Sequence, residues 1–385
     1  MIRSLKLTGF KSLDDAGLKL GAVNLLIGPN AAGKSNVVRS FRFLADAVRS
    51  DVESATAPLG GIEGAVFWGA QDARAEILLE YFVPDPSAPT SRADMRYRVV
   101  LGAVEGRAAV LEEELLVKWK RTERGKARVW LRAGLGKGHA VKDPMTAEEE
   151  EFNTGDAGVL ALKAVGFLDK FPRVRALRTF IESWQFLSVN LDAVRAPRRD
   201  ARADHLEPDA SNLVNVLRTL RGTPTYDAII EDVRVLLDMV EGVDTSVEKG
   251  RVILMLKERP FDDPVEALSA SDGTLRLLAL LTALHLMPEH GLLCVEEIEH
   301  GLHPHVFGPL LDIVRQRCPA EGARQIVVTT HSPDLLDAAQ TNEVVVVDRT
   351  DGRTTLSRLR DKDLARWRKE FRLGELWRMR QFGGV

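Results

Sequence analysis

The chain has 385 residues, of which 45% are hydrophobic and 28% charged, and its formal net charge is −3 at pH 7. This is the composition of a globular protein with a sizeable core, and it excludes a general electrostatic attraction to polyanions while leaving room for local basic patches. Two cysteines, and no apolar run near the ~20 residues of a membrane span, argue against a disulfide framework and a transmembrane helix. We therefore expect a cytoplasmic protein with no membrane partner.

The first elements are two strands and a helix. Residues 2–10 alternate polar and apolar side chains as a strand does, without the continuous apolar stretch of a signal peptide. Residues 18–27 end in an apolar run that is typical of a central strand. The segment GPNAAGKS follows directly, and NVVRSFRFLADAV then has apolar residues at helical spacing. The predicted order is strand, glycine loop, helix.

The next segment consists of short alternating runs. Between residues 73 and 132 these runs are separated by Pro, Gly and charged turns, which predicts an antiparallel sheet inserted after the first helix. Residues 133–156 are rich in Gly and Lys and then acidic, and they predict an exposed loop.

Helical spacing returns after residue 157 and predicts a helical lobe, followed by a strand at 251–258. The final third alternates helices and strands, which predicts a mostly parallel sheet. The helices are expected at 274–287, 305–317 and 334–339, and the strands at 292–297, 325–330 and 343–348.

The strongest motif runs from Gly28 to Ser35 and satisfies G-x-x-x-x-G-K-[ST] between a strand and a helix. Its glycines let backbone N–H groups surround phosphates at a helix N-terminus, Lys34 neutralises the terminal phosphates, and Ser35 offers its hydroxyl to Mg²⁺. We therefore expect ATP and Mg²⁺ as ligands. The residues expected to bind ATP here are Gly28, Pro29, Asn30, Ala31, Ala32, Gly33, Lys34, Ser35 and Asn36.

With this loop the fold class becomes specific. We expect an α/β P-loop NTPase with a mostly parallel core sheet, an antiparallel β insert and a helical lobe. The expected division is an N-terminal part of the core with the insert, a helical lobe, and a C-terminal part of the core, at residues 1–156, 157–260 and 261–385.

A phosphate loop needs a carboxylate on a neighbouring strand, and GLLCVEEIEHGLHP supplies two at the end of an apolar strand. Because successive strand side chains point to opposite faces, we assign Glu296 to the Mg²⁺ shell and Glu297 to the general base that activates the attacking water. The Gly and Pro that follow favour a turn, which argues against a zinc site built from Glu299 and the three nearby histidines.

The next strand, QIVVTTHSP, delivers His331 at its carboxyl end, where ligands bind in an open parallel sheet. A histidine there can donate a hydrogen bond to the γ-phosphate or to the attacking water. We therefore take His331, with Glu297, as a catalytic candidate.

The segment ALSASDGTLRLLALLTAL places Ser271 and Gly273 directly before an apolar helix. The simplest interpretation is a helix cap. Exposed N–H groups and a serine hydroxyl at a helix N-terminus also make an anion site. Because the chain already has one phosphate loop, a site offered to the nucleotide of another subunit would explain these residues.

With these motifs in this order, the chain resembles the ABC-type ATPases of the RecF, SMC and OLD branch, in particular the compact bacterial ATPases of the AAA family that lack a coiled coil. The resemblance covers nearly the whole chain. It rests on the opening LKLTGFKSL, the phosphate loop, the signature-like segment from Ser271 to Arg276, the EEIEHGLHP strand and the THSPDLL switch.

This resemblance implies a head-to-tail homodimer, in which two ATP molecules lie between the phosphate loop of one subunit and the signature helix of the other. On that analogy Ser271 and Gly273 bind ATP in trans. The family also has a residue that senses Mg²⁺, and the candidates for it here are Gln71, Gln185 and Asn190.

The sequence also departs from the family pattern. The family usually has Gly where Ala31 stands and often Asp where Glu296 stands. A carboxylate is retained at the second position, so metal binding is expected to survive, whereas the longer side chain is expected to retune hydrolysis.

The resemblance implies an ATP-driven dimerisation switch in DNA maintenance or anti-phage defence, acting with DNA or an effector protein. Two alternatives stay open: the nucleotide-binding subunit of a transporter, and a regulator that binds ATP without hydrolysing it. The β insert resembles the DNA-associated branch rather than transporters, and a pure binding module needs neither Glu297 nor His331.

Two arginine-rich segments, at 195–202 and 358–380, have the residue type that contacts nucleic-acid phosphates. Acidic residues such as Asp361, Asp363 and Glu370 are interleaved with the second segment. A solvated, charged face is therefore the favoured interpretation.

Overall fold

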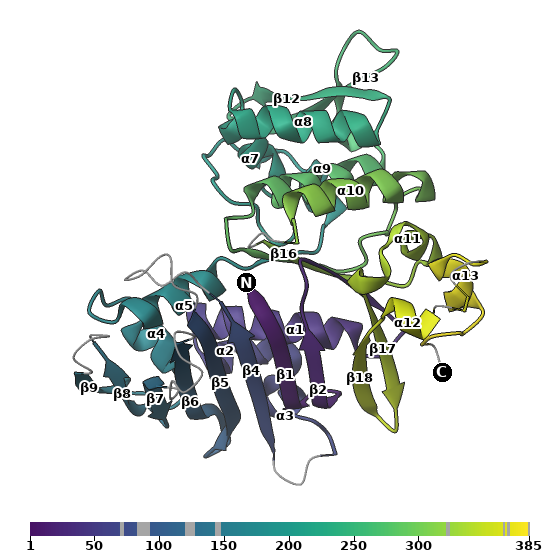
Figure 1. The fold of residues 1–385 in the computed structure, drawn as a ribbon. Coiled ribbons are helices and arrows are strands. Elements are labelled where there is room, and N and C mark those ends of the chain that lie inside the picture. The colour runs from purple at the N-terminus through teal and green to yellow at the C-terminus, as the bar shows by residue number, and fades with distance from the viewer. Residues whose placement is uncertain are drawn as a thin grey trace.

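In the residues that it describes, the computed structural model has three β-sheets, with helices between and around them (Figure 1). It describes residues 1–69, 73–82, 93–119, 128–142, 148–320, 324–364, 366–367 and 370–383.

An antiparallel sheet of eight strands occupies the N-terminal part of the chain, in the order β2-β1-β4-β5-β6-β7-β8-β9. The antiparallel insert expected between residues 73 and 132 is present, and it is extended on one edge by the first two strands. The bounds are β1 Ile2–Phe10, β2 Leu13–Lys19, β4 Arg74–Tyr81, β5 Ala93–Val104, β6 Arg107–Trp119, β7 Arg128–Gly134, β8 Lys137–Val141 and β9 Glu149–Asn153.

The loop expected at residues 133–156 is wrong, because β8 and β9 pair as antiparallel strands there. The charges that suggested a loop form ion pairs on this hairpin. A carboxylate oxygen of Glu150 lies 2.8 Å from Lys142 Nζ, and the other lies 2.7 Å from Lys170 Nζ. Opposite charges on paired strands stabilise a sheet, so a charged composition did not prevent strand formation.

The second sheet has six strands in the order β10-β15-β16-β3-β17-β18. Neighbours from β10 to β17 are parallel, and β18 pairs antiparallel with β17. This confirms the α/β fold with a mostly parallel core sheet. The bounds are β3 Val23–Ile27, β10 Gln185–Leu187, β15 Leu292–Val295, β16 Gln325–Thr330, β17 Val344–Thr350 and β18 Arg353–Arg358.

The single strand expected at residues 18–27 is wrong, because its two ends belong to different sheets. Between β2 and β3 the chain turns, and the turn is held by the Asn24 side chain. Its Oδ1 accepts a hydrogen bond from the Gly21 N–H at 2.8 Å, and its Nδ2 donates to the Gly21 carbonyl at 3.0 Å. Asn side chains favour such local turns.

The parallel sheet is covered on both faces by helices. Side chains alternate along β3, so that Leu26 joins a core with α1 while Leu25 and Ile27 join a second core with α9, α10 and α11. Figure 1 shows α1 beside the antiparallel sheet, and α9 and α10 on the other side of β16. The bounds are α1 Lys34–Arg49, α2 Val52–Thr56, α3 Gly61–Ala65, α9 Asp272–Leu286, α10 Phe307–Arg317, α11 Pro333–Ala338, α12 Asp361–Leu364 and α13 Leu373–Arg378.

Residues 157–260 divide between two parts of the molecule. The segment with α4 and α5 packs into the core of the antiparallel sheet, whereas α7 and α8 pack on α9, α8 also contacts α10, and a small third sheet packs on α7 and α8. Not all of the expected lobe is helical, because α8 ends at Leu236 and β12 begins at Val240 and pairs with β13. The domain boundaries stay a prediction. The bounds are α4 Ala161–Val165, α5 Pro172–Glu182, α6 Leu191–Arg195, β11 Arg198–Arg199, α7 Leu213–Leu220, α8 Pro224–Leu236, β12 Val240–Glu248, β13 Arg251–Glu258 and β14 Val265–Glu266.

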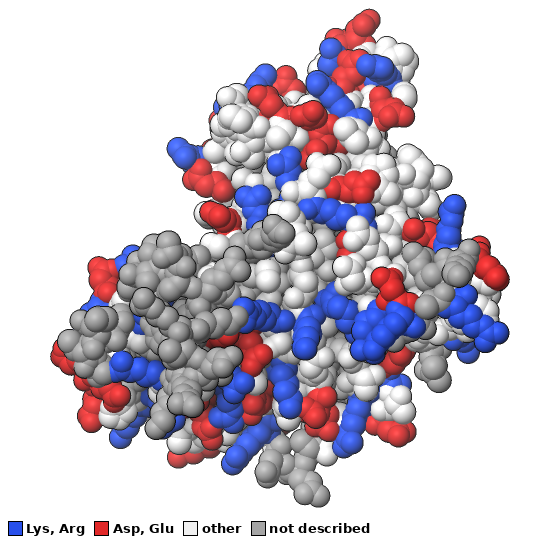
Figure 2. All heavy atoms as spheres, viewed as in Figure 1, with Lys and Arg blue, Asp and Glu red and all other residues white. Residues whose placement is uncertain are grey.

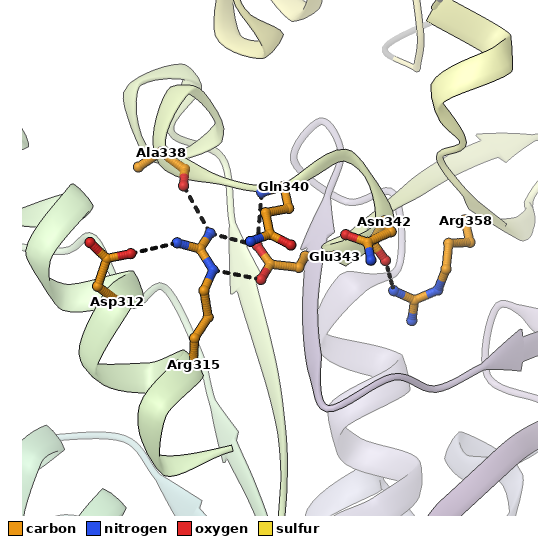
Figure 3. A network of polar contacts seen from close by, with 7 residues as sticks. All are labelled: Asp312, Arg315, Ala338, Gln340, Asn342, Glu343 and Arg358. Carbon is orange, nitrogen blue, oxygen red and sulfur yellow. Dashed lines mark hydrogen bonds and ion pairs between the residues drawn. The ribbon is translucent and has the colours of Figure 1, made fainter. Parts of the chain in front are cut away.

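An arginine on α10 ties this helix to the end of α11 and the start of β17 (Figure 3). The Arg315 guanidinium makes two hydrogen bonds of 2.8 Å to the buried carboxylate of Glu343. It also donates to Asp312 at 2.8 Å and to the carbonyl of Ala338 at 2.9 Å. Bidentate charge-assisted pairs of this kind are geometrically specific, so the two helices are held in a fixed relation.

Candidate functional site

Three neighbouring parallel strands end at one edge of the core sheet. Strand β16 lies between β15 and β3. The residues that follow these strands are Gly28 after β3, Glu296 and Glu297 after β15, and His331 after β16. The carboxyl ends of parallel strands form the ligand-binding edge of an open α/β sheet. The structure therefore brings the phosphate-loop segment, the acidic pair and the switch histidine together.

The glycine loop leads into the N-terminus of the sixteen-residue helix α1. Gly33 is the N-cap with φ 109°, and no side chain caps the first turn. A Cβ at Gly33 would lie 2.2 Å from Thr354 Oγ1, and that hydroxyl donates a 2.7 Å hydrogen bond to the carbonyl of Ala32. Uncapped N–H groups at a helix N-terminus attract anions, and here the loop that presents them is held in place by β18.

The side chain of Lys34 is half-buried and folds onto its own loop. Its ammonium donates to the carbonyls of Gly28 at 2.7 Å and Pro29 at 3.0 Å. Burial lowers the pKa of Lys34, and the negative charges of Glu299 and Glu297 partly oppose that shift. Lys34 and the acidic turn therefore belong to one electrostatic site.

The acidic turn has an unusual backbone. Glu297 has φ 52°, the left-handed region that L-residues rarely adopt, and its N–H donates to Thr329 Oγ1 at 2.9 Å. Such conformations cost about 1–3 kcal/mol and cluster at functional sites. Strand β15 ends at Val295, two residues before the end of the strand expected at 292–297, so Glu296 and Glu297 both follow it. Both acids line one small cleft together with Arg276, and their roles stay predictions.

Glu299, to which sequence analysis gave no role, reaches His331. One carboxylate oxygen, Oε1, accepts a 2.8 Å hydrogen bond from the His331 N–H and lies 3.2 Å from His331 Nδ1. Glu299 is only 9% exposed, and its Oε2 has no hydrogen-bond partner. The two residues are separated by 32 positions and lie on different loops, so no local motif joins them in the sequence.

The signature-like residues have structural contacts of their own within the chain. Ser271 is the N-cap of α9, and its hydroxyl accepts a 3.1 Å hydrogen bond from the Thr274 N–H. The Ser271 side chain lies at an exposed position, whereas Gly273 lies against the Gly301 carbonyl. The helix-cap interpretation is therefore correct for the single chain, and action in trans stays a prediction.

The candidates for the Mg²⁺ sensor lie in different places. Gln185 begins β10, pairs with Leu293, and donates to the Leu286 carbonyl at 3.5 Å, so it lies toward the amino end of the sheet. Asn190 follows the carboxyl end of β10, and its side chain caps α6. Gln71 lies outside the described residues. Position alone favours Asn190 over Gln185.

Three arginines of the two basic segments are paired with acids. Arg195 lies 2.6 Å from Asp272 and Arg202 lies 3.0 Å from Asp204. In the C-terminal segment Arg378 lies 2.6 Å from Asp334. Figure 2 shows basic and acidic residues interleaved over the visible face. Within the described part of the chain, no helix is long and apolar enough to cross a membrane.

Comparison with known proteins places this geometry in a family. Residues 23–337 match the model described as "AAA domain, putative AbiEii toxin, Type IV TA system". No curated protein sequence matches the chain.

Two solved structures show the fold. One is an SMC head bound to the C-terminal winged-helix domain of ScpA, with TM-score 0.56, 14% identity, and coverage of 92% of this chain and 96% of that chain. The other is an SMC head with an extended coiled coil bound to the C-terminal domain of ScpA, derived from Pyrococcus furiosus, with TM-score 0.51, 13% identity, and coverage of 96% and 98%. The fold is therefore that of an SMC-head-like P-loop ATPase.

Proposed function

The chain belongs to the AAA-domain family that this match describes, and from that premise we propose that it is an Mg²⁺-dependent ATPase in which ATP drives dimerisation. The observation that carries the proposal is the meeting of three elements at one sheet edge. These are the uncapped phosphate loop with Lys34, the acidic pair, and His331. Each is a residue type that phosphoryl transfer to water requires.

The residues of the loop fit a magnesium nucleotide. Lys34 would exchange the carbonyls of Gly28 and Pro29 for phosphate oxygens, and the first turn of α1 would donate its free N–H groups. Ser35 and Glu296 supply the hard oxygen ligands that Mg²⁺ prefers. When bound, the ion neutralises charge on the β- and γ-phosphates.

In the proposed reaction a water oxygen forms a bond to the γ-phosphorus while the bond to the ADP oxygen breaks. Glu297 accepts the proton that the water loses, as a general base. His331 hydrogen-bonds to the γ-phosphate or the attacking water. The left-handed backbone of Glu297 and its hydrogen bond to Thr329 support this assignment, because backbone strain of this kind clusters at functional sites, where a precise orientation is useful.

The proposed dimer is head-to-tail, with Ser271 and Gly273 of one subunit completing the nucleotide site of the other. The position of Ser271 at the exposed N-terminus of α9 supports this arrangement. A helix N-terminus has a positive end that favours phosphate.

For the biological role we propose a part in anti-phage defence with an effector protein. The family description, which names a type IV toxin–antitoxin system, supports this. The ion pairs of Arg195, Arg202 and Arg378 support a protein partner over DNA, because acids already neutralise these three arginines. Salt-sensitive binding to duplex DNA, with a log–log slope of about −0.9 per phosphate contacted, would favour DNA maintenance instead.

The proposal is tested by two measurements on the full chain. Phosphate release from ATP should require Mg²⁺, and light scattering should show a dimer with ATP and a monomer without nucleotide. ATP binding without phosphate release would favour the non-hydrolysing regulator. Absence of ATP binding would contradict the proposal altogether.

A further inference from the structure

The contact between Glu299 and His331 joins the two loops that carry the proposed catalytic groups. Glu299 lies two residues after Glu297, and its Oε1 contacts both the backbone N–H and the ring Nδ1 of His331. The contact with the backbone N–H holds the chain at the end of β16. The contact with Nδ1 influences the orientation of the imidazole ring. One buried carboxylate thus acts on both the position and the orientation of His331.

The chemistry of the two groups bears on which ring nitrogen of His331 carries the hydrogen. An ionised carboxylate can only accept hydrogen bonds, whereas a neutral imidazole has one N–H and one lone pair. A lone pair on Nδ1 would repel the carboxylate oxygen 3.2 Å away, and this favours the tautomer with the hydrogen on Nδ1. Carboxylates that contact one histidine nitrogen select the tautomer and the ring orientation in this way.

We propose that Glu299 is a positioning residue for His331, which holds the hydrogen on Nδ1 and leaves Nε2 as the nitrogen directed at the nucleotide. This inference rests on the proposed ATPase function for its catalytic consequence, but the tautomer itself does not depend on it. The neutral ring then accepts a hydrogen bond from the attacking water through Nε2, and the protonated ring donates to the γ-phosphate.

The second oxygen of Glu299 supports a functional rather than a purely structural carboxylate. Oε2 is buried without a hydrogen-bond partner, and leaving a buried charged acceptor unpaired is costly. The charge of Glu299 also acts on the Lys34 ammonium, ahead of that of Glu297. The charge of Glu299 therefore acts on the phosphate loop as well as on His331, whereas a residue that only braced the loop would not need a charge.

The tautomer is tested first in the wild-type protein without nucleotide. Protein labelled with ¹⁵N-histidine is examined by NMR at a pH where the ring is neutral, and the His331 signal is assigned by its loss in His331→Gln. The expected result is a hydrogen on Nδ1. A hydrogen on Nε2 in the wild-type protein overturns the proposal, and this outcome needs no variant of Glu299 to fold.

Two substitutions then separate the role of Glu299 as a hydrogen-bond acceptor from the packing of its side chain. Glu299→Ala should move the hydrogen to Nε2, the form that free histidine prefers, and should lower kcat about 10–100-fold, the range for residues that orient another functional group, with little change in KM for ATP. Glu299→Gln keeps an amide oxygen as acceptor and should retain the tautomer and a higher kcat than Glu299→Ala. Glu105→Gln, in an exposed turn between β5 and β6, is the control for loss of one acid.

An error in the proposed ATPase function and an error in the role of Glu299 give different experimental results. If the wild-type protein does not hydrolyse ATP, the proposed function is wrong while the tautomer of His331 can still be read. If the wild-type protein hydrolyses ATP, and Glu299→Ala folds with unchanged tautomer and kcat, the role of Glu299 is wrong and the ATPase assignment stands.

Discussion

Gly273, in the first turn of α9, packs so closely on Gly301 that a Cβ at Gly273 would lie 2.7 Å from the Gly301 carbonyl oxygen. Gly301 follows the acidic turn, and the side chain of Arg276 lies beside it. The signature helix and the acidic turn therefore touch within one chain. This contact gives a reason for glycine at position 273 that is independent of any action in trans, so Ser271 is the better residue with which to test the composite site.

Ser271→Arg should leave ATP binding intact and abolish both dimerisation and hydrolysis, because the long side chain would occupy the place of the opposite subunit's γ-phosphate. Loss of the cap alone costs about 0.5–2 kcal/mol. Thr223→Arg removes the N-cap of α8 and is the matched control for that cost. Calorimetry with ATP, light scattering and phosphate release provide the readouts, and full activity of Ser271→Arg would reject action in trans.

Mixing Ser271→Arg with Lys34→Ala chains should restore part of the ATPase activity. In a mixed dimer one composite site combines the two intact halves and the other combines the two altered halves. Recovery above the sum of the separate variants, measured as phosphate release, is the expected result if one site can turn over alone. In the control mixture, Thr223→Arg chains replace the Ser271→Arg chains. The ATPase activity of this mixture should only reflect the activity of Thr223→Arg itself.

Lys34→Ala should abolish ATP binding, because the loop loses the side-chain cation that faces the terminal phosphates. Titration calorimetry with Mg²⁺ and ATP measures the effect. Lys6→Ala is the control, since Lys6 is an exposed lysine that pairs with Asp15. An unchanged ATP affinity for Lys34→Ala would place the nucleotide elsewhere.

Ala31→Gly should stabilise the folded protein by about 0.5–1 kcal/mol. Ala31 has φ 63°, and this left-handed conformation costs an L-residue about 1–2 kcal/mol. Substitution by glycine removes that cost, but glycine has more conformational freedom in the unfolded state, which cancels about 0.5–1 kcal/mol of the gain. Ala32→Gly is the matched control, because Ala32 is buried and should lose stability on substitution. Urea denaturation measures both. Destabilisation by Ala31→Gly would show that the loop conformation is not strained.

The parts of the fold that sequence analysis predicted have strong local patterns. Strands β15, β16 and β17 each contain an apolar run of three or four residues and are separated by helices, and buried parallel strands have that appearance. The phosphate loop was evident because a strand and a helix flank it. The resemblance to the SMC branch is confirmed at the level of the fold.

The features that sequence analysis missed depend on distant partners. The β8–β9 hairpin is stabilised by Lys170, which comes from a later segment. Strand β12 follows α8 without a Gly or Pro to mark the change, and only its pairing with β13 defines it. Glu299 was set aside as part of an acidic turn, because nothing local indicates that the turn brings it to His331. Which strands pair depends on the topology of the fold, and the hydrophobic periodicity of the sequence does not encode that topology.

The central claim is that the acidic turn, the phosphate loop and the switch histidine form one ATP-hydrolysing site, and Glu297→Gln tests it most directly. The amide cannot accept a proton, and a general base contributes about 10²–10⁴-fold. The account predicts that Glu297→Gln binds Mg²⁺ and ATP with wild-type affinity, releases phosphate at least about 100-fold more slowly than the wild-type protein, and accumulates as an ATP-bound dimer in light scattering. Phosphate release by Glu297→Gln at the wild-type rate would contradict the account.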